Sequence, residues 1–144
     1  MPESVTTGAV LAFDFGTKRI GIAVGDWQVR MAHPLGEIAA EAGQARFAAI
    51  ERLMREWQPQ RLVVGLPLSP DGQEHETTRR AARFARQLEG RFGLPVSLVD
   101  ERYTSVEAEA GLRRAGARNA IRNRRIDSAA AQLILQQYFD DRPA

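Results

Sequence analysis

The segment from Leu11 to Asp26 constrains the fold of this chain most, because it predicts a β-hairpin with a carboxylate inside its first strand. Apolar residues alternate in both arms, and a Gly-Thr-Lys-Arg run between them has the composition of a turn. Asp14 lies inside the first apolar run, where an ionised carboxylate is costly unless a partner or a metal ion compensates. Gly16, two residues later, allows another backbone or a phosphate to come close. The hairpin therefore predicts a site for metal, phosphate or both.

The composition is that of an ordinary globular domain, with 144 residues, 44% of them hydrophobic and 26% charged. We expect one domain over residues 1–144, with residues 1–8 as a flexible N-terminal extension and 141–144 as a C-terminal tail. No transmembrane run or signal peptide is apparent, so we expect a cytoplasmic protein without a membrane partner. The absence of cysteine excludes thiolate metal sites and disulfides. A bound metal would have oxygen or imidazole ligands, which favours Mg²⁺ or Mn²⁺.

The order of the expected elements predicts an α/β fold. The hairpin is followed by a short extended segment within 29–38, and helical spacing of apolar residues then alternates with short apolar strands. We expect helices over 41–57, about 74–91, about 104–115 and from about 126, and strands over 61–66 and 95–100. This order gives a five-stranded mixed sheet, an antiparallel three-strand meander plus parallel strands, with helices on both faces. Functional sites in such sheets gather at strand ends.

Three carboxylates stand out by their context: Asp14 in the first strand, Glu101 at a strand end, and Asp127 in what we expect to be the first turn of the last helix. Converging carboxylates could hold a pair of hard cations. Structural interpretations remain open. Asp127 could be stabilised by the helix dipole alone, and Glu101 could pair with Arg102 or another arginine. Asp100 and Glu101 should point to opposite sides of a continuing strand, so one of the two would enter a site.

Arginines are concentrated just before the last expected helix. Six of them and no acidic residue lie between residues 113 and 125, a segment that we expect to be a loop. Such a segment attracts polyanions, and nucleic acid is the obvious candidate. The alternative is that this chain simply prefers arginine, since Lys18 is its only lysine. Trp27 and Tyr103 could stack on bases, although packing in the core or in a turn also explains them.

Four motifs in order carry a family resemblance over about residues 10–139. They are Asp14–Ala23, Val63–Leu68 with Asp71-Gly72, Asp100–Ser105, and Ile126–Ala130 with Ile134-Leu135 and Tyr138. With these motifs the chain resembles the YqgF/RuvX family of pre-16S rRNA nucleases, also described as Holliday-junction-resolvase-like proteins of the RNase H-like superfamily. Two departures from the family are visible. Arg124-Arg125 stand where relatives often have lysines, and Gln73-Glu74-His75 replace a smaller, glycine-containing segment.

The resemblance implies an RNase H-like fold and metal-dependent hydrolysis of phosphodiester bonds. It implies that Asp14, Glu101 and Asp127 are the catalytic, metal-binding triad, with two Mg²⁺ or Mn²⁺ ions. Asp14 would bridge the two ions, and each of the other acids would hold one. Phosphate contacts would come from the hairpin turn, from the arginine segment and from Arg102, which could instead orient Glu101. These expected nucleic-acid-binding residues are Thr17, Lys18, Arg19, Arg102, Arg118, Arg122, Arg124 and Arg125.

We therefore expect a cytoplasmic endonuclease that matures the 5′ end of 16S rRNA from its precursor, with a pre-ribosomal particle as a further partner. Two alternatives stay within nucleic-acid binding: a resolvase of branched DNA, and a non-catalytic RNA-binding or ribosome-assembly factor. A third is a phosphate-binding ATPase module, because Asp-Phe-Gly-Thr in a hairpin also resembles the phosphate loop of the actin and sugar-kinase superfamily. The sequence leaves open whether the protein is a monomer or a homodimer.

Overall fold

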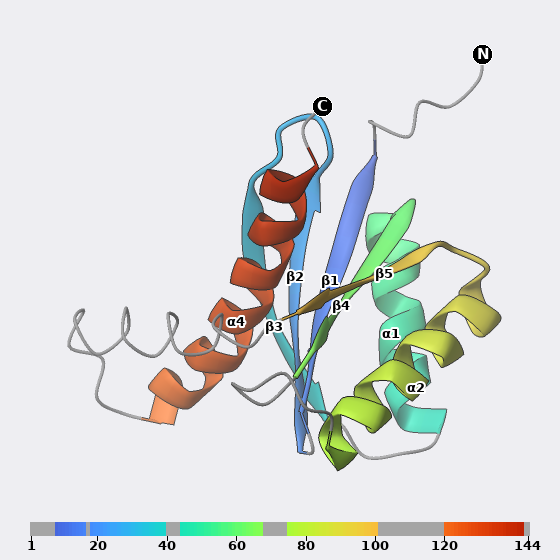
Figure 1. The fold of residues 1–144 in the computed structure, drawn as a ribbon, viewed down its shortest axis with the longest axis vertical. Helices are drawn as coiled ribbons and strands as arrows, with labels where there is room; N and C mark the ends of the chain where they lie inside the picture. Colours follow the sequence, from blue (N-terminus) through green and yellow to red (C-terminus); the bar gives the residue numbers. More distant parts are fainter. Residues whose placement is uncertain (1–7, 17, 40–43, 68–74, 101–119, 143–144) are drawn as a thin grey trace.

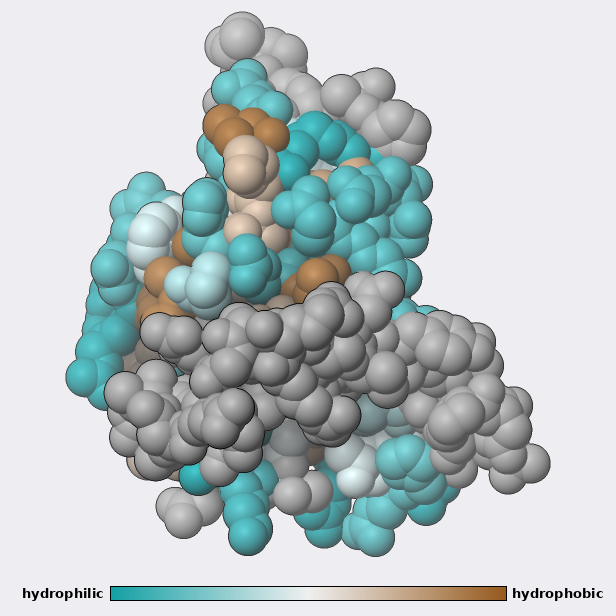
Figure 2. Space-filling view, turned by 90° about the vertical axis from the view of Figure 1, so that its left-hand side faces the viewer, coloured by the Kyte–Doolittle hydropathy of each residue, from teal (hydrophilic) through white to brown (hydrophobic). Residues whose placement is uncertain are grey.

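A five-stranded mixed sheet organises the protein in the computed structural model (Figure 1). The structure describes residues 8–16, 18–39, 44–67, 75–100 and 120–142, and of 120–128 the backbone alone; the surface of the described residues is coloured by hydropathy in Figure 2. The strand order is β3-β2-β1-β4-β5. The antiparallel part consists of β1 (Ala9–Phe15), β2 (Arg19–Asp26) and β3 (Ala32–Ala39), and β4 (Arg61–Leu66) and β5 (Val96–Asp100) follow parallel to β1. The expected mixed sheet is confirmed.

Helices cover both faces of this sheet (Figure 1). One face carries α1 (Gln44–Trp57) and α2 (Glu76–Phe92), and the other carries α4 (Ala120–Asp141). Among the described helices, none combines the length and the hydropathy that crossing a bilayer requires. The helix expected over about 104–115 lies outside the described residues.

The expected start of the last helix near Ile126 is wrong, because α4 begins at Ala120. Residues 120–125 contain no glycine or proline, and alanine and arginine are strong helix formers. The C-terminal part of the arginine segment therefore continues the helix instead of forming a loop.

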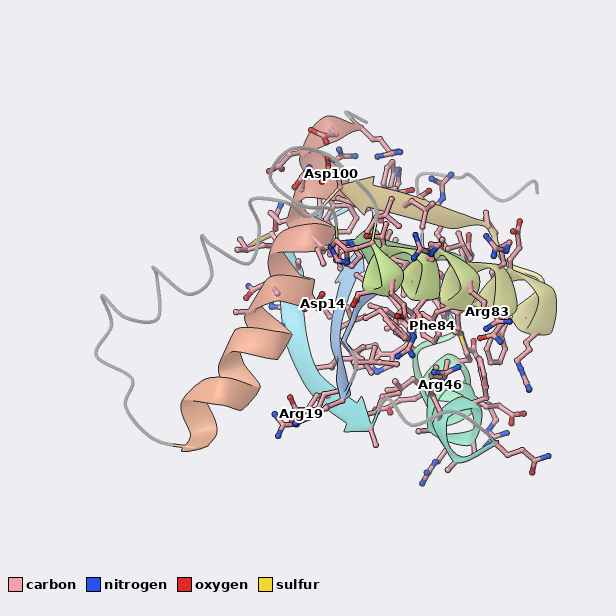
Figure 3. The ribbon with its side chains drawn as sticks, turned by 60° about the horizontal axis from the view of Figure 1, so that its bottom comes forward. Asp14, Arg19, Arg46, Arg83, Phe84 and Asp100 are labelled. Carbon is pink, nitrogen blue, oxygen red and sulfur yellow. The ribbon has the colours of Figure 1, made fainter. Side chains whose placement is uncertain are left out.

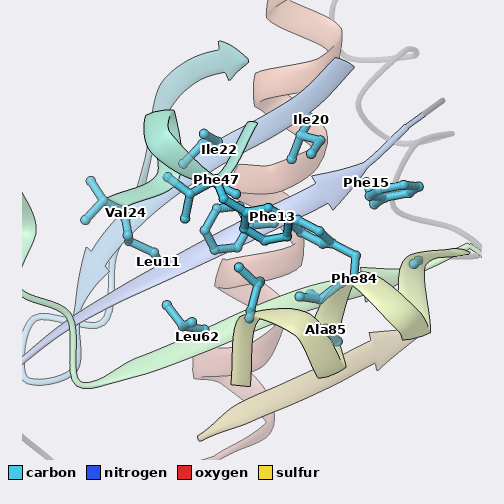
Figure 4. Close-up of a cluster of buried hydrophobic side chains, with 14 residues drawn as sticks. Leu11, Phe13, Phe15, Ile20, Ile22, Val24, Phe47, Leu62, Phe84 and Ala85 are labelled. Carbon is cyan, nitrogen blue, oxygen red and sulfur yellow. The ribbon is translucent and has the colours of Figure 1, made fainter. Parts of the chain in front are cut away.

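The face towards α1 and α2 is filled by large apolar side chains (Figure 4). Phe84 of α2 is at its centre, with ring centroids 5.7 Å from Phe13, 5.2 Å from Phe15 and 6.3 Å from Phe47. Odd-numbered residues of β1 and even-numbered residues of β2 and β4 point into this cluster, which confirms the alternation expected from the sequence.

The face towards α4 is built from smaller residues. Ala12 and Ala23 point to this side, and α4 lies so close that a Cβ atom on Gly25 would be 2.7 Å from the Phe139 ring. Trp27 is buried here, with ring centroids 5.5 Å from Tyr138 and 5.7 Å from Phe139. Core packing, and not base stacking, therefore explains Trp27.

Polar contacts fix the C-terminal half of α4 against the end of β2 and the start of β3. The Gln132 side-chain amide donates to the Ala32 carbonyl at 3.0 Å, and that of Gln136 donates to the Arg30 carbonyl at 3.0 Å. The Arg30 guanidinium donates to the carbonyl of Phe139 at the end of the helix and stacks 4.7 Å from the Trp27 ring centroid. These contacts set the position of α4 along the sheet.

Candidate active site

Asp14 lies in a row of paired residues that crosses all five strands. Its partner on β2 is Gly21 and its partner on β4 is Gly65, and the row continues to Glu37 on β3 and Val99 on β5. Paired residues in a sheet point to the same face, and residues two apart on a strand share a face. Because Val99 and residues 10 and 12 of β1 pack in the α4-side cluster, Asp14 faces α4.

The neighbours of Asp14 leave space around its partly buried carboxylate. Glycine at both paired positions means that no side chain from β2 or β4 stands directly beside it. An apolar pair at these positions would enclose the carboxylate, which would raise the cost of keeping it ionised. The register therefore places no side chain of either paired residue over the Asp14 carboxylate.

Gly16 shapes the hairpin turn next to Asp14. Its N–H donates to the Arg19 carbonyl at 2.9 Å, and a Cβ atom on Gly16 would be 2.7 Å from that oxygen. The expected close approach of another backbone is thus confirmed, and the backbone is that of the hairpin itself. A side chain at residue 16 would force the turn open beside the site.

The end of the sheet that carries Asp14 is also the end where α2 begins. Pro67 directly follows β4, and the Thr78 hydroxyl in the first turn of α2 donates to its carbonyl. The His75 N–H donates back to Thr78 Oγ1 at 3.2 Å, which closes the start of the helix. Figure 3 looks onto this end of the molecule, with Asp14 and Asp100 labelled.

Asp100 lies on the face opposite to Asp14. It is exposed, and its strand partner Leu66 packs against the core on the side of α1 and α2. Val99 before it is buried on the side of α4. Glu101 and Arg102 lie outside the described residues, and Asp127 lies on α4 where only the backbone is described.

The backbone position of Asp127 excludes one of its interpretations. The first turn of α4 has no acidic residue, and Asp127 lies seven residues after the helix start at Ala120. The stabilising effect of the helix dipole on an acid falls off within the first turn. The alternative that Asp127 is stabilised by the helix dipole alone, which depended on a helix start near Ile126, is therefore wrong.

The expected phosphate-binding residues do not all lie in one loop. Arg122, Arg124 and Arg125 lie on the first two turns of α4, where their side chains are not described, and Arg118 and Thr17 lie outside the described residues. Lys18 is exposed at the tip of the hairpin. Arg19 Nε lies 3.4 Å from Glu37 Oε1, so this arginine has a structural contact as well.

Glu37 is a carboxylate on the Asp14 face that sequence reasoning missed. Pro34 and Gly36 interrupt the alternation of β3, so the sequence pattern does not reveal which side Glu37 faces. Two strand spacings separate its backbone from that of Asp14, or about 10 Å. Among the described residues, no three acidic, histidine or cysteine side chains gather into a metal-binding group.

Comparison with known proteins identifies the family. The profile of the RuvX family, described as Holliday junction resolvase, matches residues 8–141. The chain belongs to this family. A RuvX relative from Methylobacillus flagellatus is 52% identical over 139 residues, covering 96% of this chain and 95% of the relative. Another, from Nitrosomonas europaea, is 51% identical over 142 residues, covering 97% and 96%. Both relatives bear the name "Putative pre-16S rRNA nuclease".

Solved structures with low sequence identity share the fold. Thermus thermophilus RuvC in complex with a Holliday junction has a TM-score of 0.53 at 15% identity, covering 93% of this chain and 94% of RuvC. The fowlpox virus resolvase in complex with a Holliday junction has a TM-score of 0.57 at 10% identity, covering 92% and 97%. The expected family, the RNase H-like fold and the nuclease class of this RuvX member are confirmed.

Proposed function

We propose that this RuvX family member is a divalent-metal-dependent endonuclease that matures the 5′ end of 16S rRNA in the cytoplasm, with the pre-ribosomal particle as its natural substrate. The observation that carries the proposal is Asp14, a partly buried carboxylate between Gly21 and Gly65 on the sheet face towards α4. The names of the relatives favour precursor rRNA as the substrate.

Asp127 is the second member of the proposed acidic centre. It precedes Ala130, Ala131 and Ile134 by three, four and seven residues, and this spacing places residues on one side of a helix. Those three residues are buried, and the last two pack in the cluster between α4 and the sheet. Helical periodicity therefore predicts that Asp127 shares the side of α4 that faces the sheet.

Glu101 is the third proposed member. It is two residues beyond Val99, which belongs to the Asp14 row and is buried on the side of α4. The alternation of strand side chains predicts that a residue in this position turns to the same side as Asp14. The exposed Asp100 has the opposite parity and is excluded from the centre by the same reasoning.

The donor set fits hard divalent cations, because three carboxylates supply oxygen ligands and the glycines beside Asp14 leave room. We propose Mg²⁺ or Mn²⁺, held by Asp14, Glu101 and Asp127. When bound, a pair of such ions supplies activation of water and stabilisation of the leaving oxygen in phosphodiester hydrolysis. The exposed Lys18 and Arg19 at the hairpin would contact the phosphates next to the cleaved bond, together with Thr17 and Arg102.

The arginines around the start of α4 form the other proposed contact with the substrate. Arg122, Arg124 and Arg125 lie on the helix within two turns before Asp127, and Arg118 precedes them in the sequence. Positive charge here would hold the nucleic-acid backbone next to the acidic centre. The description of the family as Holliday junction resolvase favours branched DNA as a second candidate substrate.

The test compares cleavage of a labelled 16S rRNA precursor and of a four-way DNA junction in Mg²⁺, Mn²⁺ or EDTA. The variants are Asp14→Asn and, as a matched control, Asp100→Asn on the opposite face. We expect metal-dependent cleavage of the precursor, a loss of at least about 100-fold in Asp14→Asn, and little change in Asp100→Asn. Cleavage of the junction alone would favour the resolvase. Binding without cleavage in every metal condition would favour an assembly factor.

A further inference from the structure

An arginine face on α2 lies outside the proposed acidic centre. Arg79, Arg83 and Arg86 are exposed, and their spacing of four and three residues places them on one side of the helix. The opposite side of α2 is buried against the sheet, so this face is directed towards solvent. With Arg80 and Glu76 these residues line a groove of about 440 Å³.

Positive charge predominates among the described residues that line this groove. Glu76 is the one acidic residue among them, and it pairs with Arg80, with Nη2 and Oε2 3.0 Å apart. Within the described part of the chain, the other three arginines have no acidic partner within 4.0 Å.

A solvated helix face is a poor explanation for this pattern. Like charges four residues apart destabilise a helix, whereas opposite charges at that spacing stabilise it. The outer face of α1 follows the stabilising pattern, with Arg55 3.3 Å from Glu51. The arginine face of α2 has the unfavourable pattern at Arg79 and Arg83, so a polyanionic partner explains it better than solubility does.

The position of the groove connects it to the proposed site. The first turn of α2 is bonded to Pro67, directly after β4 and at the end of the sheet that carries Asp14. Figure 3 shows Arg83 on α2 and Asp14 in this view. Seven helical residues from Arg79 to Arg86 span about 10 Å, so the three guanidinium groups form an elongated positive surface along the helix.

We propose that Arg79, Arg83 and Arg86 bind the phosphate backbone of the substrate RNA beyond the cleaved bond, as a second contact surface across the end of the sheet from Asp14. The identity of the RNA rests on the proposed function, whereas the affinity of this surface for an RNA backbone does not. Because the contacts are to phosphate, they add affinity and orientation without sequence preference.

The test measures binding of a fluorescently labelled single-stranded RNA by polarisation in EDTA, where no cleavage occurs, over a range of salt concentrations. Arg79→Gln/Arg83→Gln is compared with Arg52→Gln/Arg55→Gln, which removes the same charge from exposed positions on α1. Circular dichroism checks that both variants remain folded. We expect the α2 variant to bind at least about tenfold more weakly, and its slope of log K against log salt to fall by about 1.4, the value for two lost phosphate contacts. The α1 variant should bind within about twofold of the wild type.

Three results would contradict the proposal that this surface binds RNA. They are wild-type affinity and salt slope in the α2 variant, equal losses of affinity in both variants, and no RNA binding by the wild type at low salt. Failure of the proposed function is distinguishable from these results. If Asp14→Asn and the wild type are equally inactive in cleavage while the α2 variant loses RNA binding, the arginine surface stands and the proposed cleavage of the 16S rRNA precursor at Asp14 falls.

Discussion

The two faces of the sheet differ in what their side chains do. Towards α1 and α2, large apolar side chains from the strands and both helices pack around Phe84. Towards α4, alanine and glycine let the helix come close, and a carboxylate stands in the row between Gly21 and Gly65. The strands therefore contribute large buried side chains to one face. On the other face they contribute small residues, which leave room for an acidic site at the end of the strands.

The largest effect on stability should come from the α1 and α2 face. Phe84→Ala removes a ring that is 1% exposed and contacts three other aromatic rings. We expect urea unfolding to show a loss of about 3–5 kcal/mol in the free energy of unfolding. The exposed neighbour Arg83→Ala should change it by less than about 0.5 kcal/mol. Equal small changes in both variants would show that this face is not the main core.

An intermediate effect is expected where α4 touches the sheet. In Gly25→Ala the new methyl group would be 2.7 Å from the Met31 carbonyl oxygen and from the Phe139 ring. Overpacking of this kind should lower the free energy of unfolding by about 1–3 kcal/mol, measured by urea unfolding. The matched control is Gly90→Ala on α2, where no atom lies within 4 Å, and we expect a gain of about 0.4–1 kcal/mol. A neutral Gly25→Ala would contradict the close seating of α4.

The smallest effect on stability should come from the residue that matters most for activity. Asp14→Asn keeps the shape of the side chain and removes the cost of holding a charge in a partly buried strand. We expect the free energy of unfolding, again from urea titration, to stay within about 1 kcal/mol of the wild type. A loss above about 2 kcal/mol in the free energy of unfolding would mean that Asp14 stabilises the fold. The two faces would then not differ in the way described above.

The sequence was sufficient to predict the elements whose pattern is local. Alternation over residues 11–24 predicts the hairpin and the face that its large residues fill, and helical spacing predicts α1 and α2 close to their observed ends. The start of α4 was missed because the charge of the arginine segment suggested a loop, although Asn119 directly before Ala120 is of a residue type favoured at helix starts.

Features that depend on pairing between distant segments could not be predicted. Gly65 becomes the neighbour of Asp14 only through the parallel pairing of β1 with β4, which no local pattern specifies. Glu37 was missed because Pro34 and Gly36 disrupt the alternation of an edge strand. The arginine face of α2 was hidden in a chain rich in arginine, and it is recognised only when the opposite side of the helix is known to be buried.

Mapping of the metal site by affinity cleavage tests the central claim most directly, because it requires neither substrate nor activity. Fe²⁺ takes the place of the divalent cation, and ascorbate with hydrogen peroxide then cuts the polypeptide close to the bound ion. We expect cuts near residues 14, 101 and 127 that excess Mg²⁺ suppresses and that Asp14→Asn abolishes. Cuts confined to other segments, or cuts that persist unchanged in Asp14→Asn, would contradict an acidic centre on the α4 face of the sheet.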